Sequence, residues 1–112
     1  MLSDPDQKSM LTSNTKKKQY RSIGHRLKPV VTVAQKGFTE NIRKEIDRAL
    51  TEHELVKVKL LTPERSGKKK LSNEICLDLQ AECIQSVGNI ILLYRAAKNP
   101  DSRLSNLSRK LS

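Results

Sequence analysis

Apolar residues recur along this chain with two periods, one typical of helices and one typical of strands. Helical spacing predicts a first helix that Ser13 or Asn14 caps and that ends near Leu27, because Pro29 cannot continue it. A β-branched run of valines follows and predicts a short buried strand over 30–34. The chain therefore opens with a helix and a strand.

A second helix is expected over about 39–53. Thr39 is a suitable N-cap, and apolar side chains recur on one face of this segment at the helical period. Residues 55–61 then alternate apolar and basic side chains, which predicts a strand with Lys57 and Lys59 on the face opposite the apolar residues. Two interpretations of these lysines stay open: they bind phosphate, or their side chains extend over the sheet edge or cover a helix.

The third helix is expected to open with the lysines at 68–70 and to end near Cys83. Lysines at that position oppose the helix dipole, so helix stability alone does not explain them. Gly88 and Asn89 then separate two apolar runs, which predicts a two-residue hairpin with glycine in the first turn position. Because 90–94 is almost continuously apolar, it is expected to be a central strand.

These elements predict an α+β fold in a two-layer α/β arrangement, with the order helix, strand, helix, strand, helix, strand, strand. Four strands form one mixed sheet with helices packed against it, and the first two strands form a right-handed parallel unit. Residues 13–97 make up this single domain. Residues 1–12 are expected to be a disordered lead-in, and 98–112 a basic, disordered tail, with a helix that packs on a partner as the alternative.

The charge balance favours a polyanionic partner. The 112 residues carry 22 Lys and Arg against 12 Asp and Glu, and the net charge of +10 is more typical of nucleic-acid binding than of membrane binding. With one Phe, two Tyr and no Trp, the chain has few rings for stacking on bases. The chain has no apolar run of about 18 residues and no secretory signal, so a cytoplasmic protein is expected.

No metal, cofactor or catalytic activity is expected from the motifs. On one helix, Cys76 and Cys83 would lie about two turns apart, which is too far for a disulfide, so they are expected to be buried, reduced thiols. His25 and His53 complete no spacing typical of a zinc site. The sequence also lacks a GxSxG motif, a P-loop and paired carboxylates in an apolar setting, so it is not expected to be an enzyme.

A strand, a basic glycine loop and a helix follow one another in a way that suits a phosphate backbone. Gly37 permits a sharp turn, Lys36 adds a charge, and the N-terminus of the next helix adds N–H donors. In the alternative interpretation, Gly37 serves only the turn and Lys36 is solvated. Basic residues of the first helix and one arginine of the second extend the candidate site. The candidate RNA-binding residues are Lys16, Lys17, Lys18, Arg21, Arg26, Lys28, Gln35, Lys36, Gly37 and Arg43.

Three separated motifs resemble one known family. LKPVV at 27–31 leads into the glycine loop and a helix that starts with TE, and HELVKVKLL at 53–61 and VGNIILLYR at 87–95 follow in the same order. Together they are similar to the bacterial YhbY-type CRM domain, a chloroplast RNA splicing and ribosome maturation module. Members of that family carry a KH-like GxxG loop, whereas Ala34 stands here in place of the first glycine.

The resemblance implies a function. YhbY-type proteins associate with precursors of the large ribosomal subunit and act in ribosome biogenesis, so the expected partner is large-subunit rRNA and the expected activity is assistance in assembly. A KH-like loop holds about four nucleotides of backbone. We expect a monomer. Two alternatives stay open, namely a general DNA-binding or nucleoid protein, which backbone electrostatics would serve equally, and a small RNA-modifying enzyme.

Overall fold

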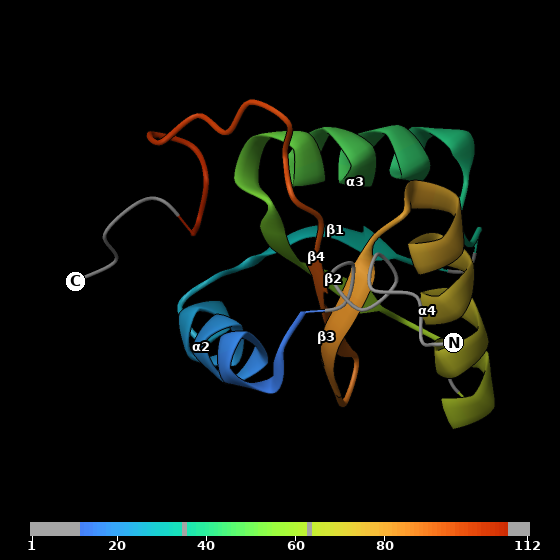
Figure 1. Cartoon of the computed structure of the whole chain (residues 1–112). Helices are drawn as coiled ribbons and strands as arrows, with labels where there is room; N and C mark the ends of the chain where they lie inside the picture. Colours follow the sequence, from blue (N-terminus) through green and yellow to red (C-terminus); the bar gives the residue numbers. More distant parts are fainter. Residues whose placement is uncertain (1–11, 35, 63, 108–112) are drawn as a thin grey trace, which may run out of the picture.

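The computed structural model describes residues 12–34, 36–62 and 64–107. Its elements follow the order expected for the α+β fold, which is confirmed (Figure 1). They are α2 (Asn14–Gly24), β1 (Pro29–Val33), α3 (Glu40–His53), β2 (Leu55–Leu60), α4 (Arg65–Leu79), β3 (Glu82–Val87) and β4 (Ile90–Tyr94). No described helix is long and apolar enough to cross a membrane.

The four strands form one mixed sheet in the order β1-β2-β4-β3. β1 and β2 are parallel, whereas β4 is antiparallel to both of its neighbours. β4 is therefore an interior strand, as its apolar sequence predicted. The turn between β3 and β4 is the expected two-residue hairpin, since Val87 pairs with Ile90 and Gly88 has a φ of +59°.

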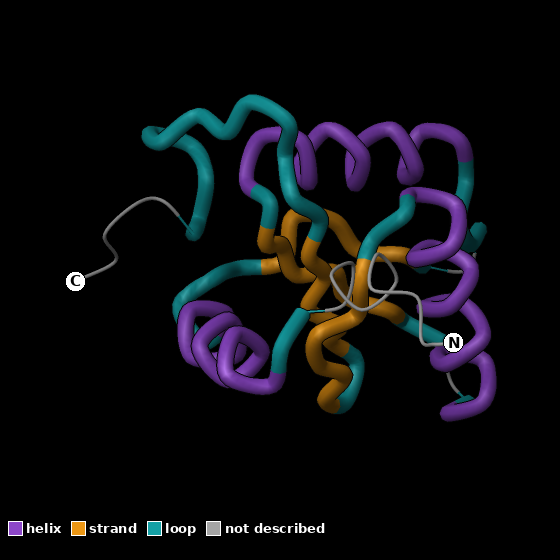
Figure 2. The backbone as a smooth tube through the Cα atoms, viewed as in Figure 1, coloured by secondary structure: helices purple, strands orange, loops and turns teal. Residues whose placement is uncertain are grey.

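The main core lies between the sheet and the helices α3 and α4 (Figure 2). Alternate residues of the strands point to this face, and Val33, Val58 and Leu93 are fully buried there. α3 contributes Ile46 and Leu50 from one stripe of its surface. Thr39 caps α3 as expected, because its side chain accepts a hydrogen bond of 3.3 Å from the N–H of Ile42.

In the described part of the chain, the opposite face of the sheet is covered at one end, by α2 together with Leu107. Tyr20 of α2 is buried there with Leu55, Ile84 and Leu92, which point away from the main core. Gly24 lies so close that a Cβ atom would stand 2.8 Å from Cδ2 of Leu92, which explains a glycine within the helix. α3 and α4 form the second layer of the expected two-layer arrangement, and α2 adds a partial third layer.

The third helix ends at Leu79, so its predicted end near Cys83 is wrong. Gln80 adopts the left-handed region with a φ of +56°, which ends the helix, and the N–H of Ala81 then donates to the carbonyl of Cys76 at 2.9 Å. Cys83 consequently lies on β3. Cys76 and Cys83 are half-buried free thiols on different elements, and burial raises the pKa of Cys76 to about 11.

Residues 98–107 contain neither helix nor strand, yet the last of them are packed against the domain. Ser105 is fully buried and donates a hydrogen bond of 2.7 Å to Oε1 of Glu54. The side chain of Asn106 donates to the carbonyl of Leu55 at 2.7 Å. These two residues thus supply hydrogen-bond partners to a buried carboxylate and to the backbone of β2, while the disordered tail over 98–112 and the lead-in over 1–12 stay predictions. Residues 1–11 and 108–112 of these segments lie outside the described residues.

Candidate nucleic-acid interface

The glycine loop is a tight turn at the end of β1. Gly37 has a φ of +75°, and its N–H donates to the carbonyl of Ala34 at 2.9 Å. A Cβ atom at Gly37 would meet nothing within 4 Å, so the backbone angle requires the glycine and space does not. The N–H of Gly37 thus serves the turn. The likeness of this loop to a KH loop stays a prediction, and Gln35 lies outside the described residues.

The N-terminus of α3 leaves donors available next to this loop. The N–H groups of Glu40 and Asn41 have no acceptor among the described residues, whereas that of Ile42 is satisfied by Thr39. Lys36 is exposed beside them. The carboxylate of Glu40 in the first turn reduces the local positive potential. An anion here would therefore depend mainly on the charge of Lys36.

Arg43 is held by a partner on α4. Its Nε donates to Oδ2 of Asp78 at 2.7 Å, and this hydrogen bond, together with the charge of Asp78, raises the pKa of Arg43. Both side chains are partly exposed. The contact ties the start of α3 to the end of α4. A role of Arg43 toward a ligand stays a prediction and would compete with this ion pair.

The basic residues of the first helix lie at the other end of the sheet from the glycine loop (Figure 1). α2 packs where β1 and β2 begin, and the loop leaves the end of β1, so the two groups are separated by a strand of about 16 Å. Lys17 lies 3.4 Å from the carboxylate of Glu82. Of the other predicted basic residues in this region, Arg21 is half-buried. Four are exposed, namely Lys16, Lys18, Arg26 and Lys28.

Two sets of cations outside the predicted list lie near these groups. Lys57 and Lys59 of β2 point to the face that carries α2, as the alternation of the strand indicated. The lysines and the arginine at the start of α4 form the second set, and the hydrogen bond from Leu61 N to Val33 O places their loop beside the glycine loop. The sequence signal for the second set was a charge run that opposes the helix dipole.

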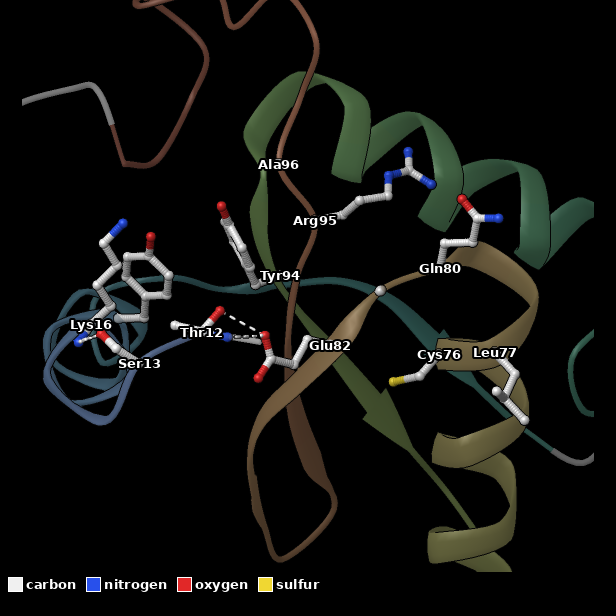
Figure 3. A pocket seen from close by; sticks show the side chains of 12 residues that line it. Thr12, Ser13, Lys16, Cys76, Leu77, Gln80, Glu82, Tyr94, Arg95 and Ala96 are labelled. Carbon is white, nitrogen blue, oxygen red and sulfur yellow. Dashed lines mark hydrogen bonds between the residues drawn. The ribbon is translucent and has the colours of Figure 1, made fainter. Parts of the chain in front are cut away.

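A groove of about 810 Å³ lies between the start of α2, the end of α4 and the strands β3 and β4 (Figure 3). Glu82 accepts hydrogen bonds from the N–H and Oγ1 of Thr12 at 3.1 and 2.6 Å. Burial raises the pKa of Tyr94 to about 12, so its hydroxyl is neutral at physiological pH.

In the described part of the chain, no group of three or more His, Cys, Asp or Glu residues is arranged to hold a metal ion.

The guanidinium of Arg95 beside the groove is satisfied within the protein. It bonds Oδ1 of Asp47 at 2.7 Å, and it also donates to the carbonyl groups of Leu79 and Asp47 and to Thr51. Leu77, by contrast, points into solvent with 81% of its surface exposed. Neither the groove nor the Arg95 network was indicated by the sequence, because both depend on contacts between distant segments.

Comparison with known proteins gives consistent results. A probable RNA-binding protein of Pseudomonas aeruginosa is 45% identical over 100 residues, which cover 89% of this chain and 96% of the relative. An RNA-binding protein of Haemophilus influenzae is 38% identical over 96 residues, covering 85% of this chain and 97% of its own. The fold also matches the solution structure of a hypothetical protein of Staphylococcus aureus, named as a candidate RNA-binding protein. The TM-score is 0.70 at 30% identity, with 80% of this chain and 93% of that chain covered.

The family is shown by a match over nearly the whole described domain. The family model of the CRS1 / YhbY (CRM) domain matches residues 12–95, which run from the start of α2 to the end of β4. The resemblance inferred from three short motifs is thereby confirmed. The chain belongs to the CRS1 / YhbY (CRM) domain family.

Proposed function

We propose that this protein binds RNA, and that its partner is rRNA in precursors of the large ribosomal subunit, whose assembly it assists. The observation that carries the proposal is a net charge of +10 on a chain that belongs to the CRM family and whose relatives are named as RNA-binding proteins. A protein with that excess of cations gains affinity for a polyanion by releasing condensed counterions. The ribosomal partner rests on the family resemblance.

Backbone contacts should contribute more than base contacts. All three aromatic residues are engaged in the fold, because Tyr20 is buried, Tyr94 packs against it with ring centroids 5.0 Å apart, and Phe38 packs against the main core. None of them stands free as a platform for a stacked base. The exposed cations are instead suited to phosphate groups, which carry no sequence information. We therefore propose recognition by shape and charge.

Sedimentation tests the ribosomal partner. A cell lysate is run through sucrose gradients at low and at moderate salt, and each fraction is probed for this protein. We expect migration with large-subunit precursors at low salt and release at moderate salt, since phosphate contacts weaken as salt rises. Treatment with ribonuclease before the run should move the protein to the top. A protein that stays at the top at both salts would contradict the proposed partner.

Duplex DNA is the main competing ligand, because backbone electrostatics would serve it equally. Competition separates the two. Labelled rRNA precursor bound to the protein is challenged with unlabelled duplex DNA or unlabelled rRNA precursor at equal phosphate concentration. If DNA competes as well as RNA, a general DNA-binding or nucleoid protein becomes the better description. We propose no catalytic role, and we propose that the protein acts as a monomer in the cytoplasm.

A further inference from the structure

Among the described residues, none covers the face of the sheet that carries α2 at its other end. Leu92 and Ile84 are buried under α2, but toward the end of β1 and β2 no described element covers the sheet. The residues there are Thr32 and Lys59, which pair in register and are exposed, and Val87, which keeps 61% of its surface exposed. This end of the sheet lies between α2 and the glycine loop.

We propose that an RNA backbone crosses this uncovered end of the sheet, with Lys57 and Lys59 as phosphate ligands. The inference rests on the proposed RNA-binding function and extends it, because these two lysines bridge the basic residues of α2 and Lys36 at the far end of β1. Lys57 pairs with Pro29, next to Lys28, and Lys59 lies two residues closer to the glycine loop. The basic residues of α2, Lys57, Lys59 and Lys36 thus form one continuous series of cations, which we call the basic track.

The neighbours of the two lysines leave their charge uncompensated. In the sheet register Lys59 lies between Thr32 and Ile90, and Lys57 lies between Pro29 and Leu92. An acidic cross-strand partner would stabilise such a lysine, and neither has one. No described carboxylate lies within 4.0 Å of either ammonium group. Two like charges about 7 Å apart on one strand face are arranged for an external polyanion.

The surroundings favour backbone over base recognition here as well. The uncovered end carries two aliphatic side chains, the exposed Val87 and the half-buried Ile90, and no described aromatic ring lies on it. Stacking is therefore not available at this place. The exposure of Lys59 and the interior position of β2 in the sheet support phosphate binding over the alternatives in which the lysines extend over the sheet edge or cover a helix.

A charge-neutralising double variant tests the inference. Lys57→Gln combined with Lys59→Gln removes two cations. Glutamine retains two methylene groups, which can replace part of the packing made by the half-buried aliphatic chain of Lys57. Binding of a fluorescently labelled single-stranded RNA of about 12 nucleotides is measured by anisotropy over a range of salt concentrations. We expect the affinity to fall about tenfold and the slope of log K against log salt to fall by about 1.4, which is roughly 0.7 for each lost contact.

A matched control separates position from net charge. Lys44→Gln combined with Lys98→Gln also removes two cations, both of them exposed and away from the uncovered end of the sheet. We expect this control to keep the slope of the unmodified protein. Equal losses in both double variants would overturn the inference, as would an unchanged slope in the Lys57 and Lys59 variant.

Two further measurements complete the test. Thermal unfolding of the double variant should match that of the unmodified protein, and amide shifts in an NMR titration with the same RNA should include Thr32 and Lys59. Shifts confined to α2 and the glycine loop would contradict the track. If the unmodified protein shows no salt-dependent binding, the proposed function itself fails, and that outcome differs from a failure of the track alone.

Discussion

Lys36 and Gly37 show how one short loop divides its tasks between neighbouring residues. Gly37 supplies a backbone angle that a residue with a Cβ atom resists, and its N–H closes the turn onto Ala34. Lys36 takes no part in the described ion pairs and is exposed. The N–H of Gly37 is used within the turn, as in the alternative interpretation in which this glycine serves only the turn. If the loop binds a ligand, the contact should therefore come mainly from Lys36.

Reversing the charge of Lys36 should separate binding from stability. Lys36→Glu is expected to weaken binding of single-stranded RNA about tenfold, because a carboxylate would face the phosphates. The free energy of unfolding should change by less than about 0.5 kcal/mol, as is usual for an exposed residue. Anisotropy and thermal unfolding measure the two effects. Lys44→Glu, which changes net charge equally on the exposed side of α3, is the control, and equal affinity of all three proteins would remove the loop from the site.

At the scale of elements, α4 begins in an unusual way. Glu64 at the N-cap makes no capping hydrogen bond, and no acidic residue lies in the first turn. Arg65 and the lysines at 68–70 instead place positive charge at the positive end of the helix dipole. α3 begins with a capping threonine and an acidic residue, so the two helices start under opposite electrostatic conditions. Packing of Ile75 and Leu79 in the main core stabilises α4 despite its first turn.

Removing cations from the start of α4 should stabilise the protein. Lys68→Gln combined with Lys69→Gln relieves the repulsion from the helix dipole and is expected to raise the free energy of unfolding by about 0.5 kcal/mol. The gain should shrink at high salt, since salt screens exposed charges. Urea unfolding at low and at high salt measures both effects. Two exposed lysines outside the described helices, Lys28 and Lys98, serve as controls when they are changed to glutamine, and a loss of stability in the test variant would contradict the dipole argument.

In the whole molecule, residues 97–106 of the C-terminal segment form hydrogen bonds with residues 53–55, where α3 ends and β2 begins. Glu54 has a φ of +65° and is nearly buried, and its carboxylate accepts from Ser105 and from the N–H of Ala97. The N–H of Asn106 donates to the carbonyl of His53 at 2.9 Å. These contacts join residues about 50 positions apart. They give residues 101–107 a structural role that their composition did not indicate.

Loss of the Ser105 hydroxyl should destabilise this connection. Ser105→Ala removes the hydrogen bond to Oε1 of Glu54 and is expected to lower the free energy of unfolding by about 1–3 kcal/mol, because a buried carboxylate oxygen loses a donor. The midpoint of urea unfolding reports this loss. Ser102→Ala, at an exposed position of the same segment, should change it by less than about 0.5 kcal/mol. If the two variants unfold at the same urea concentration, the hydroxyl of Ser105 does not stabilise the fold.

Local sequence patterns predicted the elements and their order correctly. Helical and strand periods, the cap at Thr39 and the glycine at 88 act over a few residues, so they can be read locally. The charge of +10 and the family motifs likewise belong to the chain alone. These local signals also placed Lys57 and Lys59 on one face of their strand, because side chains alternate along any strand.

Which of these residues contact one another depends on how the elements pack. The ion pair of Arg43 with Asp78 and the docking of Ser105 on Glu54 both depend on contacts between segments distant in the sequence. The same holds for the candidate site, since the sheet places the length of β1 between the basic helix and the glycine loop. A local pattern fixes the direction of a side chain, but the partner that it finds there depends on how the elements pack.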